Sequence, residues 1–520
     1  MSKDRMLFLT LLSLVVFWSV TAVGGMVVDN VWVRTYNGPG NSEDVPCAIE
    51  VDNSGNVYIT GYSTGNGTFS DYATIKYYPD GDTAWVRRYN GPADTSDIAF
   101  AMAIDDLGNV YVTGSSHGSG SKSDYLTIKY QSSGDTAWVR RYNGPSNGND
   151  VAYALALDGS GNVYVTGFSS NSGMGKDYAT LKYDQNGNQI WVKNYNGPGN
   201  DADWANGIAV DPWGNIYVTG VSRGEGTYYD YLTLKYDPDG DTLWVRRYDG
   251  PESGDNYANA IALDGSGNVY VTGWCYSSST LYQYATVKYD SNGNQGWAKT
   301  FAAEQTITPG ATALDIEADN FGNVWVTGWD RRSETLFDYA TVKYDDEGNQ
   351  LCGTFYHSWL DGCDGANALT IDNQGNAYVT GWSDDLDLTA DDFATVKYDQ
   401  DGNQLWLARY NGPSDSWDNA KAITVDDSNY VYVTGQSVGT SSANDYVTIK
   451  YVQLDALRGD VNSDEEINLS DVIYLANYLL KSGSSPAIQL SGDVNCDWEI
   501  NMSDVIYLAN YLLKGGPPPC

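Results

Sequence analysis

The stretch Asn162-Val163-Tyr164-Val165-Thr166-Gly167 decides the fold, because close copies of it recur along the chain at a nearly fixed spacing. The copies end at Gly61, Gly114, Gly167, Gly220, Gly273, Gly328, Gly381 and Gly435. The first four steps are 53 residues long, and the last three are 55, 53 and 54. A period of this size indicates that one supersecondary unit has been copied many times.

Each copy contains four apolar stretches of strand length, which Gly, Asp, Asn and Pro separate. In the second copy they cover residues 99–104, 109–113, 125–130 and 138–142, and none has a helical period. Four strands in a unit of this length are the signature of a β-propeller blade. The short turns begin with Asp and contain a Gly that supplies the positive φ. The last copy has Asn429 at this place, and Asn tolerates that conformation best after Gly.

The two ends of the repeat array predict a closed ring. Residues 32–36 read as a fourth strand with no blade before it, and residues 445–451 as a third strand with no fourth strand after it. Pairing them completes an eighth blade and removes exposed strand edges. We therefore predict an all-β, eight-bladed propeller over residues 30–453. Its outermost strands carry tryptophans that pack between blades, at positions 32, 85, 138, 191, 244, 297 and 406.

The repeats resemble the bacterial β-propeller repeat family known as SBBP. The resemblance rests on residues 183–188 leading to Trp191, and on residues 209–211 leading to residues 214–220. It covers about four-fifths of the chain and implies the fold. It implies little about activity, because such a scaffold has no single shared chemistry.

Composition and the N-terminus suggest an exported protein. The formal net charge is −38, which argues against nucleic acid or an anionic membrane as a partner. Residues 1–25 read as a signal peptide, with Lys3 and Arg5 before an apolar stretch and small residues after it. A retained membrane anchor is the alternative. After cleavage we expect a secreted bacterial protein with no membrane insertion; periplasmic or cell-surface association are the alternatives.

Six cysteines in an exported chain invite disulfides. Cys352 and Cys363 fall in the irregular seventh repeat and are predicted to pair. Cys496 and Cys520 are predicted to pair near the C-terminus. The pairing of Cys47 and Cys275 stays open.

Residues 455–516 form a different module with two matching loop–helix segments. Each begins with oxygen-bearing side chains at the spacing of a calcium-binding loop, positions 1, 3, 5, 7, 9 and 12, where position 7 uses its backbone carbonyl. We predict two Ca²⁺ ions. The ligands are Asp460, Asn462, Asp464, Glu466, Asn468 and Asp471, and then Asp493, Asn495, Asp497, Glu499, Asn501 and Asp504.

With no helix before the first loop, this pair of units resembles a type I dockerin domain. The resemblance implies a small α-helical domain with EF-hand-type loops and a cohesin-bearing scaffold as partner. It also implies that Leu469-Ser470 and Met502-Ser503 help to read the cohesin, in either of two orientations. Glu465 and Trp498 stand where such loops usually have Gly, which predicts weaker binding of calcium. A calcium-stapled module without a cohesin partner stays open.

The propeller face with the longer connections is the candidate binding surface, because only these connections vary among the copies. Trp274, Trp329, Trp382 and Trp417 lie there and are candidates for stacking on sugars. Packing between blades is the alternative. An aspartate also opens the first and third strands of most copies; it either caps its own loop or contributes to an acidic ring that binds a cation.

We favour a secreted binding or scaffold protein that takes a polysaccharide or an extracellular protein. One alternative is a polysaccharide-degrading enzyme, a glycoside hydrolase or lyase, attached through its dockerin; another is a structural surface protein. Catalysis has weak support, because His117 and His357 are the only histidines and no catalytic motif is recognisable.

Overall fold

The computed structural model describes residues 26–171, 175–226, 228–302, 310–319, 321–331, 336–358, 362–384, 390–455, 460–462, 467–481, 492, 494–495 and 500–514. The predicted signal peptide lies outside these ranges. Residues 30–452 form one compact unit, and the chain from residue 453 onward belongs to another. Each unit is described by itself.

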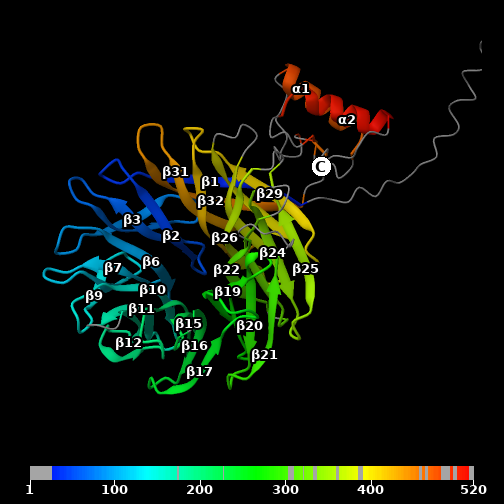
Figure 1. The fold of residues 1–520 in the computed structure, drawn as a ribbon. Helices are drawn as coiled ribbons and strands as arrows, with labels where there is room; N and C mark the ends of the chain where they lie inside the picture. The colour runs from blue at the N-terminus through cyan, green and yellow to red at the C-terminus, as the bar shows by residue number, and fades with distance from the viewer. Residues whose placement is uncertain are drawn as a thin grey trace, which may run out of the picture. The chain divides into compact units, whose positions relative to one another are not determined.

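The described residues form eight four-stranded antiparallel sheets, so the predicted eight-bladed propeller is confirmed (Figure 1). From the innermost strand outward, blade 1 contains β2 (Asp44–Val51), β3 (Val57–Thr64), β4 (Ser70–Tyr77) and β5 (Thr83–Tyr89), and blade 2 contains β6 (Asp97–Ile104), β7 (Val110–His117), β8 (Ser123–Tyr130) and β9 (Thr136–Tyr142). Blade 3 contains β10 (Asp150–Leu157), β11 (Val163–Asn171), β12 (Gly175–Tyr183) and β13 (Gln189–Tyr195), and blade 4 contains β14 (Asp203–Val210), β15 (Ile216–Arg223), β16 (Tyr229–Tyr236) and β17 (Thr242–Tyr248).

The second half of the ring repeats this order. Blade 5 contains β18 (Asn256–Leu263), β19 (Val269–Ser277), β20 (Leu281–Tyr289) and β21 (Gln295–Phe301), and blade 6 contains β22 (Thr312–Ala318), β23 (Val324–Asp330), β24 (Asp338–Tyr344) and β25 (Gln350–Tyr356). Blade 7 contains β26 (Asp364–Ile371), β27 (Ala377–Asp384), β28 (Asp391–Tyr398) and β29 (Gln404–Tyr410), and blade 8 contains β30 (Asp418–Val425), β31 (Val431–Val438), β32 (Asn444–Asp455) and β1 (Met26–Tyr36).

Blade 8 takes its strands from both ends of the repeat array. Strand β1 lies beside β32, in the order β1-β32-β31-β30 (Figure 1). On β1, the indole N–H of Trp32 donates to the carbonyl of Pro79 in blade 1, over 3.1 Å. Lys450 of β32 donates to the same carbonyl over 3.2 Å. The innermost strand of blade 8 also contacts that of blade 1. These contacts close the ring at a seam between blades 8 and 1.

A close backbone approach explains the glycine that ends each copy of the motif. The innermost strand of each blade has a β-bulge, which in blade 3 falls at Tyr153, between Ala152 and Ala154. The bulge brings the carbonyl of Val151 over Gly167, where a Cβ atom would lie 2.0 Å from the oxygen. At all eight motif glycines this distance is 1.9–2.2 Å. No side chain fits there.

The short turns are held by their first aspartate. Asp158 accepts backbone N–H bonds from Ser160 and Asn162, both at 2.9 Å, and further bonds from the Asn162 amide and the Tyr164 hydroxyl. Burial raises the pKa of Asp158, but these bonds outweigh it, so the pKa lies below its ordinary value. In the last copy Asn429 adopts a φ of 62°, as predicted for the residue that replaces Gly.

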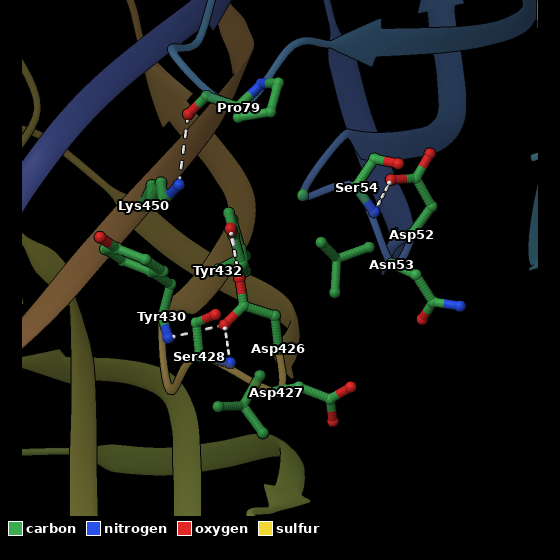
Figure 2. Close-up of a pocket in the computed structure, with 13 residues that line it drawn as sticks. Asp52, Asn53, Ser54, Pro79, Asp426, Asp427, Ser428, Tyr430, Tyr432 and Lys450 are labelled. Atoms are coloured by element: carbon green, nitrogen blue, oxygen red, sulfur yellow. Dashed lines mark hydrogen bonds between the residues drawn. The ribbon is translucent and has the colours of Figure 1, made fainter.

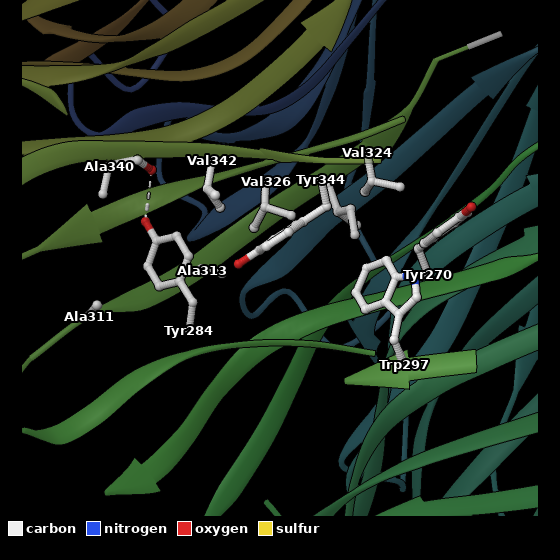
Figure 3. Packing of buried hydrophobic residues seen from close by; sticks show 11 residues of the cluster. Tyr270, Tyr284, Trp297, Ala311, Ala313, Val324, Val326, Ala340, Val342 and Tyr344 are labelled. Atoms are coloured by element: carbon white, nitrogen blue, oxygen red, sulfur yellow. Dashed lines mark hydrogen bonds between the residues drawn. The ribbon is translucent and has the colours of Figure 1, made fainter. Parts of the chain in front are cut away.

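Aromatic and aliphatic side chains fill the space between neighbouring blades. Between blades 5 and 6, Trp297 lies 6.0 Å from Tyr270 and 5.6 Å from Tyr344, measured between ring centroids (Figure 3). The Tyr284 hydroxyl donates to the carbonyl of Ala340 over 2.9 Å (Figure 3). Equivalent clusters recur around the ring, so the predicted packing role of the outermost-strand tryptophans is confirmed.

The second unit contains two helices, α1 (Leu469–Lys481) and α2 (Met502–Lys514), which pack against each other. Asn468 caps α1 by accepting the N–H of Ser470 over 2.8 Å, and Asn501 caps α2 in the same way through Ser503. Their shared core consists of Val461, Leu475, Val494, Val505 and Leu508. Within the described ranges, no helix is long and apolar enough to cross a membrane.

The disulfide predicted between Cys352 and Cys363 is wrong, because both thiols are free. Cys352 pairs with Lys343 at one end of β24, whereas Cys363 forms a β-bridge to Phe337 just before its other end. Six residues of strand separate these ends by about 20 Å, and a disulfide needs Cα atoms within about 7 Å. Cys47 and Cys275 are also free. Cys496 and Cys520 lie outside the described residues.

Candidate functional site

The first loop of the C-terminal unit is organised around Asp471. Its Oδ1 accepts the backbone N–H groups of Val461 and Asn462, at 2.8 and 3.2 Å, and its Oδ2 accepts that of Asn468 at 2.9 Å. Asp471 is fully buried in the first turn of α1. One carboxylate therefore ties the start of the loop to the start of the helix.

The second loop repeats this arrangement. Asp504 accepts the N–H groups of Val494 and Asn495, at 3.0 and 3.3 Å, and that of Asn501 at 2.9 Å. The predicted ligands that can be placed are Asp460, Asn462, Asn468, Asp471, Asn495, Asn501 and Asp504. The others, Asp464, Glu466, Asp493, Asp497 and Glu499, lie outside the described residues.

The placed residues fit a calcium ion. Burial is the largest cause that raises the pKa of Asp471, and repulsion from Asp460 adds to it. Asp460 is buried as well. Carboxylate and amide oxygens such as these are the hard donors that calcium prefers. Among the described residues no group of three or more His, Cys, Asp or Glu gathers as a metal site, and five of the eight acidic predicted ligands fall outside them.

The residues predicted to read a partner lie on the surface. Leu469 is 50% exposed and Met502 is 41% exposed, and Ser470 and Ser503 beside them are exposed too. Each helix continues this apolar stripe on its outer side. The further exposed residues are Ile473 and Leu480 on α1, and Ile506 and Leu513 on α2. The two stripes occupy equivalent positions of the two copies.

Three of the four candidate tryptophans of the propeller occupy one equivalent position. Trp274, Trp329 and Trp382 each follow the motif glycine, near the end of the second strand in blades 5, 6 and 7. All three are half-buried. Trp274 stacks on Tyr257, with ring centroids 4.4 Å apart, and Tyr282 meets its edge.

The other two indoles of this group also have neighbours. Trp329 meets Phe337 edge to face at 4.9 Å. Trp382 lies directly over Gly365, where a Cβ atom would come within 2.7 Å of the indole. Trp417 is 46% exposed and donates its N–H to Asp391. The indoles are thus partly packed and partly open to solvent.

The bulges place one side chain per blade around the central channel, which the sequence did not reveal. All eight are half-buried, and in blades 4, 5 and 7 an asparagine amide bonds to a carbonyl of the next innermost strand. The bulged residues are Cys47, Phe100, Tyr153, Asn206, Asn259, Leu314, Asn367 and Lys421.

Three carboxylates lie deeper along the innermost strands. Glu50 in blade 1 and Asp315 and Glu317 in blade 6 stand where the other blades have Ala, Gly or Thr. Water reaches them, but protein surrounds them. Burial raises the pKa of Glu50 to about 7 and that of Asp315 to about 6. Burial, with repulsion from Asp315 and Glu50, raises that of Glu317 to about 8. The sequence does contain a sign of these buried acids, because the equivalent positions of the other copies hold small residues.

A cavity of about 340 Å³ opens at the seam on the face of the short turns (Figure 2). Its lining includes Asp52 and Asp426. Lys450 lies over the ring of Tyr430, 4.1 Å from its centroid, and donates to Pro79. Both aspartates hold their own turns by accepting backbone N–H groups. The carboxylates of Asp52 and Asp426 are therefore used to hold their own turns, and they do not point together at a common ligand position.

The fold and the loops define a β-propeller protein that carries a calcium-loop module. Residues 458–514 match the family model of the dockerin type I domain. Residues 84–120, 190–226 and 243–278 match that of the SBBP β-propeller repeat. The chain therefore contains SBBP-type β-propeller repeats and a C-terminal type I dockerin domain. Type I dockerin domains typically bind calcium.

Likenesses to individual proteins are weak. An uncharacterized WD repeat-containing protein, L264 of Acanthamoeba polyphaga mimivirus, is 25% identical over 402 residues, which cover 65% of this chain. The match covers 26% of that relative, so the chain spans about a quarter of its length.

Solved structures match the chain at low identity and with low TM-scores. The β-propeller domain of the Trilobed protease from Pyrococcus furiosus is 10% identical, with a TM-score of 0.37, over 71% of this chain and 96% of that one. The V. cholerae biofilm matrix protein Bap1 is 11% identical, with a TM-score of 0.33, over 82% and 91%.

Proposed function

We propose that this protein is exported and attaches through its calcium-loaded dockerin to a cohesin-bearing scaffold, on which it displays the propeller. The observation that carries the proposal is the exposure of Leu469-Ser470 and Met502-Ser503 at equivalent ends of two buried-core helices. The match of residues 458–514 to the dockerin family supports it. Because the two helices present equivalent residue pairs, a cohesin could dock in either of two equivalent orientations.

Calcium would be held in the first loop by Asp460, Asn462, Asn468 and Asp471, and in the second by Asn495, Asn501 and Asp504, together with the ligands outside the described residues. The bound ion neutralises carboxylates that repel one another. Asp471 and Asp504 also hold the loop backbone against the start of each helix. The loops thereby position the exposed pairs for a partner.

Binding of the full-length chain to a panel of cohesin modules tests this function. We expect binding with calcium and loss of binding in chelator. Changing Leu469 and Ser470 to Glu should weaken binding only about twofold, because the second copy still docks. Changing Met502 and Ser503 as well should weaken it about 100-fold, which is about 2.7 kcal/mol.

The matched control is Leu107→Glu, which alters a side chain that is 79% exposed in a propeller turn. It should bind like the wild type. A calcium-loaded chain that binds no cohesin of the panel contradicts the attachment and favours a calcium-stapled module with another role.

A second function is favoured for the propeller face, namely the binding of a polysaccharide. Trp274, Trp329 and Trp382 stand at one equivalent position on three consecutive blades. Large flat rings that keep part of their surface in water suit stacking on sugars, because aromatic side chains combine an apolar body with little conformational entropy. An extracellular protein is the alternative ligand of this face.

Retention on a panel of insoluble polysaccharides tests this second function. Each change of Trp274, Trp329 or Trp382 to Ala should weaken retention about tenfold, or about 1.4 kcal/mol. Trp213→Ala is the control, because Trp213 is 66% exposed in a short turn at the other end of its blade. Equal losses in control and test variants would contradict the assignment. Release of reducing ends would support the glycoside hydrolase instead, and no retention would favour a structural surface protein.

A further inference from the structure

Five aromatic side chains of blades 4 and 5 contact one another near the strand ends where the longer connections begin. Trp204 and Tyr229 of blade 4 lie 5.5 Å apart, measured between ring centroids. Tyr257 of blade 5 lies 5.8 Å from Trp204 and 5.6 Å from Tyr229. Tyr257 also stacks on Trp274, which contacts Tyr282 at 4.5 Å. We call these five half-buried side chains the aromatic row.

The last ring of the aromatic row follows a strained turn. The backbone N–H of Tyr282 donates to the carbonyl of Thr280 over 2.8 Å, and Leu281 between them has a φ of 63°. A hydrogen bond that closes three residues around a positive φ is the rare and strained form of the γ-turn. Among the described residues, Leu281 is the only one other than Gly, Asn and Asp with a positive φ. The chain therefore accepts strain at the residue that precedes Tyr282.

The connection between the second and third strands could avoid this strain with glycine. Residues 278–280 of blade 5 contain no glycine, whereas blades 1, 2 and 4 have two glycines each in this connection, namely Gly65, Gly67, Gly118, Gly120, Gly224 and Gly226. Neighbouring segments hold the loop of blade 5. Glu252 accepts the backbone N–H of Ser278 over 2.8 Å, and the carbonyl of Tyr282 accepts that of Ala311 over 3.0 Å. Strain that the surrounding structure maintains is typical of functional sites.

The groups around the aromatic row are mainly negative. Asp255 accepts the backbone N–H of Tyr229 over 3.2 Å. Hydrogen bonds from Ser278 hold the pKa of Glu252 below its ordinary value, so this carboxylate stays charged. Both acids belong to the connection between blades 4 and 5.

One cation lies among these acids and is paired with a further carboxylate. Arg223 lies over the ring of Tyr229, 5.8 Å from its centroid, and forms an ion pair with Asp201 at 2.5 Å. A carboxylate or sulfate on a ligand would therefore meet like charges, which disfavour its binding. An uncharged ligand meets no such repulsion.

We propose that the aromatic row binds a stretch of a polysaccharide built from uncharged sugars and excludes polymers of uronic acids. The inference rests on the polysaccharide binding proposed above for Trp274. It extends that site over a second blade, assigns it a class of sugar and makes Leu281 a positioning residue. The added contact residues are Trp204, Tyr229, Tyr257 and Tyr282.

The chemistry of the aromatic row fits this ligand. A sugar ring has an apolar C–H face that can lie on an aromatic ring, and hydroxyl groups at its edge. Rings fixed on neighbouring strands are in place before the ligand arrives, so little conformational entropy is lost on binding. The exposed Ser278 and Ser279 offer hydroxyl groups beside the rings. Apolar rings with a few polar groups are the usual composition of a small-ligand site.

Binding of the full-length protein to immobilised polysaccharides tests the proposal. Mannan, xylan and β-glucan are the uncharged probes, and polygalacturonate is the acidic probe. We expect binding to at least one uncharged polymer and little binding to polygalacturonate. Tyr282→Ala and Trp204→Ala should each weaken binding about tenfold. Trp213→Ala is the control, because its exposed indole lies at the other end of its blade.

Leu281→Gly tests positioning separately from folding. Glycine adopts a positive φ without strain, so the unfolding temperature should not fall. The loop then gains conformations in which Tyr282 leaves Trp274, and binding should weaken about threefold. A change that only disturbed the fold would lower the unfolding temperature and the affinity together.

Asp201→Asn tests the exclusion of acidic sugars. It removes the carboxylate that pairs with Arg223, so binding to polygalacturonate should increase. Asp241→Asn is the matched control, because Asp241 pairs with Lys193 at 3.8 Å in a short turn. It should leave the binding of both kinds of polymer unchanged.

The outcomes separate this inference from the function on which it rests. A wild type that binds no polysaccharide would overturn both. Binding that Trp274→Ala weakens but Tyr282→Ala, Trp204→Ala and Leu281→Gly leave intact would overturn the aromatic row alone. Equal binding of the wild type to polygalacturonate and to an uncharged polymer would also overturn it.

Discussion

Removal of residues 31–36 should leave blade 8 with three strands and turn the propeller into a less stable, self-associating protein. The deletion removes the buried Trp32, whose loss alone costs about 3–5 kcal/mol. It also removes Tyr36, which packs on Tyr446 at 5.6 Å and accepts a hydrogen bond from Arg88 in blade 1. The exposed edge of β32 then offers unpaired backbone groups to other copies. Light scattering and thermal unfolding would measure both effects.

A pair of point variants separates the seam from ordinary packing. Trp32→Ala and Trp138→Ala remove equally buried indoles, 6% and 7% exposed, but only Trp32 lies on the strand that closes the ring. We expect self-association of Trp32→Ala alone. A truncated chain that stays monomeric with an unchanged unfolding temperature would show that these two chain ends do not close the ring.

The propeller should lose stability as the pH rises from 5 to 9. The pKa of Glu50 is about 7 and that of Glu317 is about 8 in the folded chain, well above ordinary glutamate values. Groups with raised pKa values bind protons more tightly when folded, so their contribution is complete below about pH 4 and is lost as the pH passes through about 7–8. Allowing for water in the channel, we expect a loss on the order of 3 kcal/mol from these two residues.

The double change Glu50→Gln and Glu317→Gln should remove this part of the pH dependence. The variant should be more stable than the wild type at pH 9 and similar to it at pH 5. Asp106→Asn, in an exposed turn, is the control for a change of charge. The other buried aspartates contribute the same pH dependence of stability to the wild type and to the double variant. Denaturant unfolding at several pH values measures the free energy of unfolding of both proteins. If this free energy depends on pH in the same way in the wild type and the double variant, Glu50 and Glu317 do not cause the pH dependence.

Most of the fold could be predicted from the period of the repeat. Eight glycine-ended motifs predicted eight blades, and the unpaired stretches around residues 32–36 and 445–451 predicted the closing blade. Asn429 could be placed because only a few residues adopt its backbone conformation. The helices followed from the loop spacing. Each of these features is local in sequence or repeated, so no knowledge of the packing was needed.

Features that depend on register were not predictable. The separation of eleven positions between Cys352 and Cys363 suggested proximity, but the strand between their pairing partners carries them to opposite ends of blade 6. The bulges that line the channel change which residue faces inward, and alternation alone does not reveal them. The sequence shows Glu50 and Glu317 only as acids where other copies have Ala or Thr, and their burial depends on the assembled blades.

The position of β32 decides how the propeller meets a mechanical load. The chain leaves β32 to enter the dockerin, so any pull from an anchored dockerin reaches the propeller at the end of this strand. Because β1 lies on one edge of β32 and β31 on the other, two backbone ladders share the tension. Without β1, the pull would peel an edge strand one hydrogen bond at a time. In a chain anchored through its dockerin, the closing strand would therefore spread the pull over two backbone ladders.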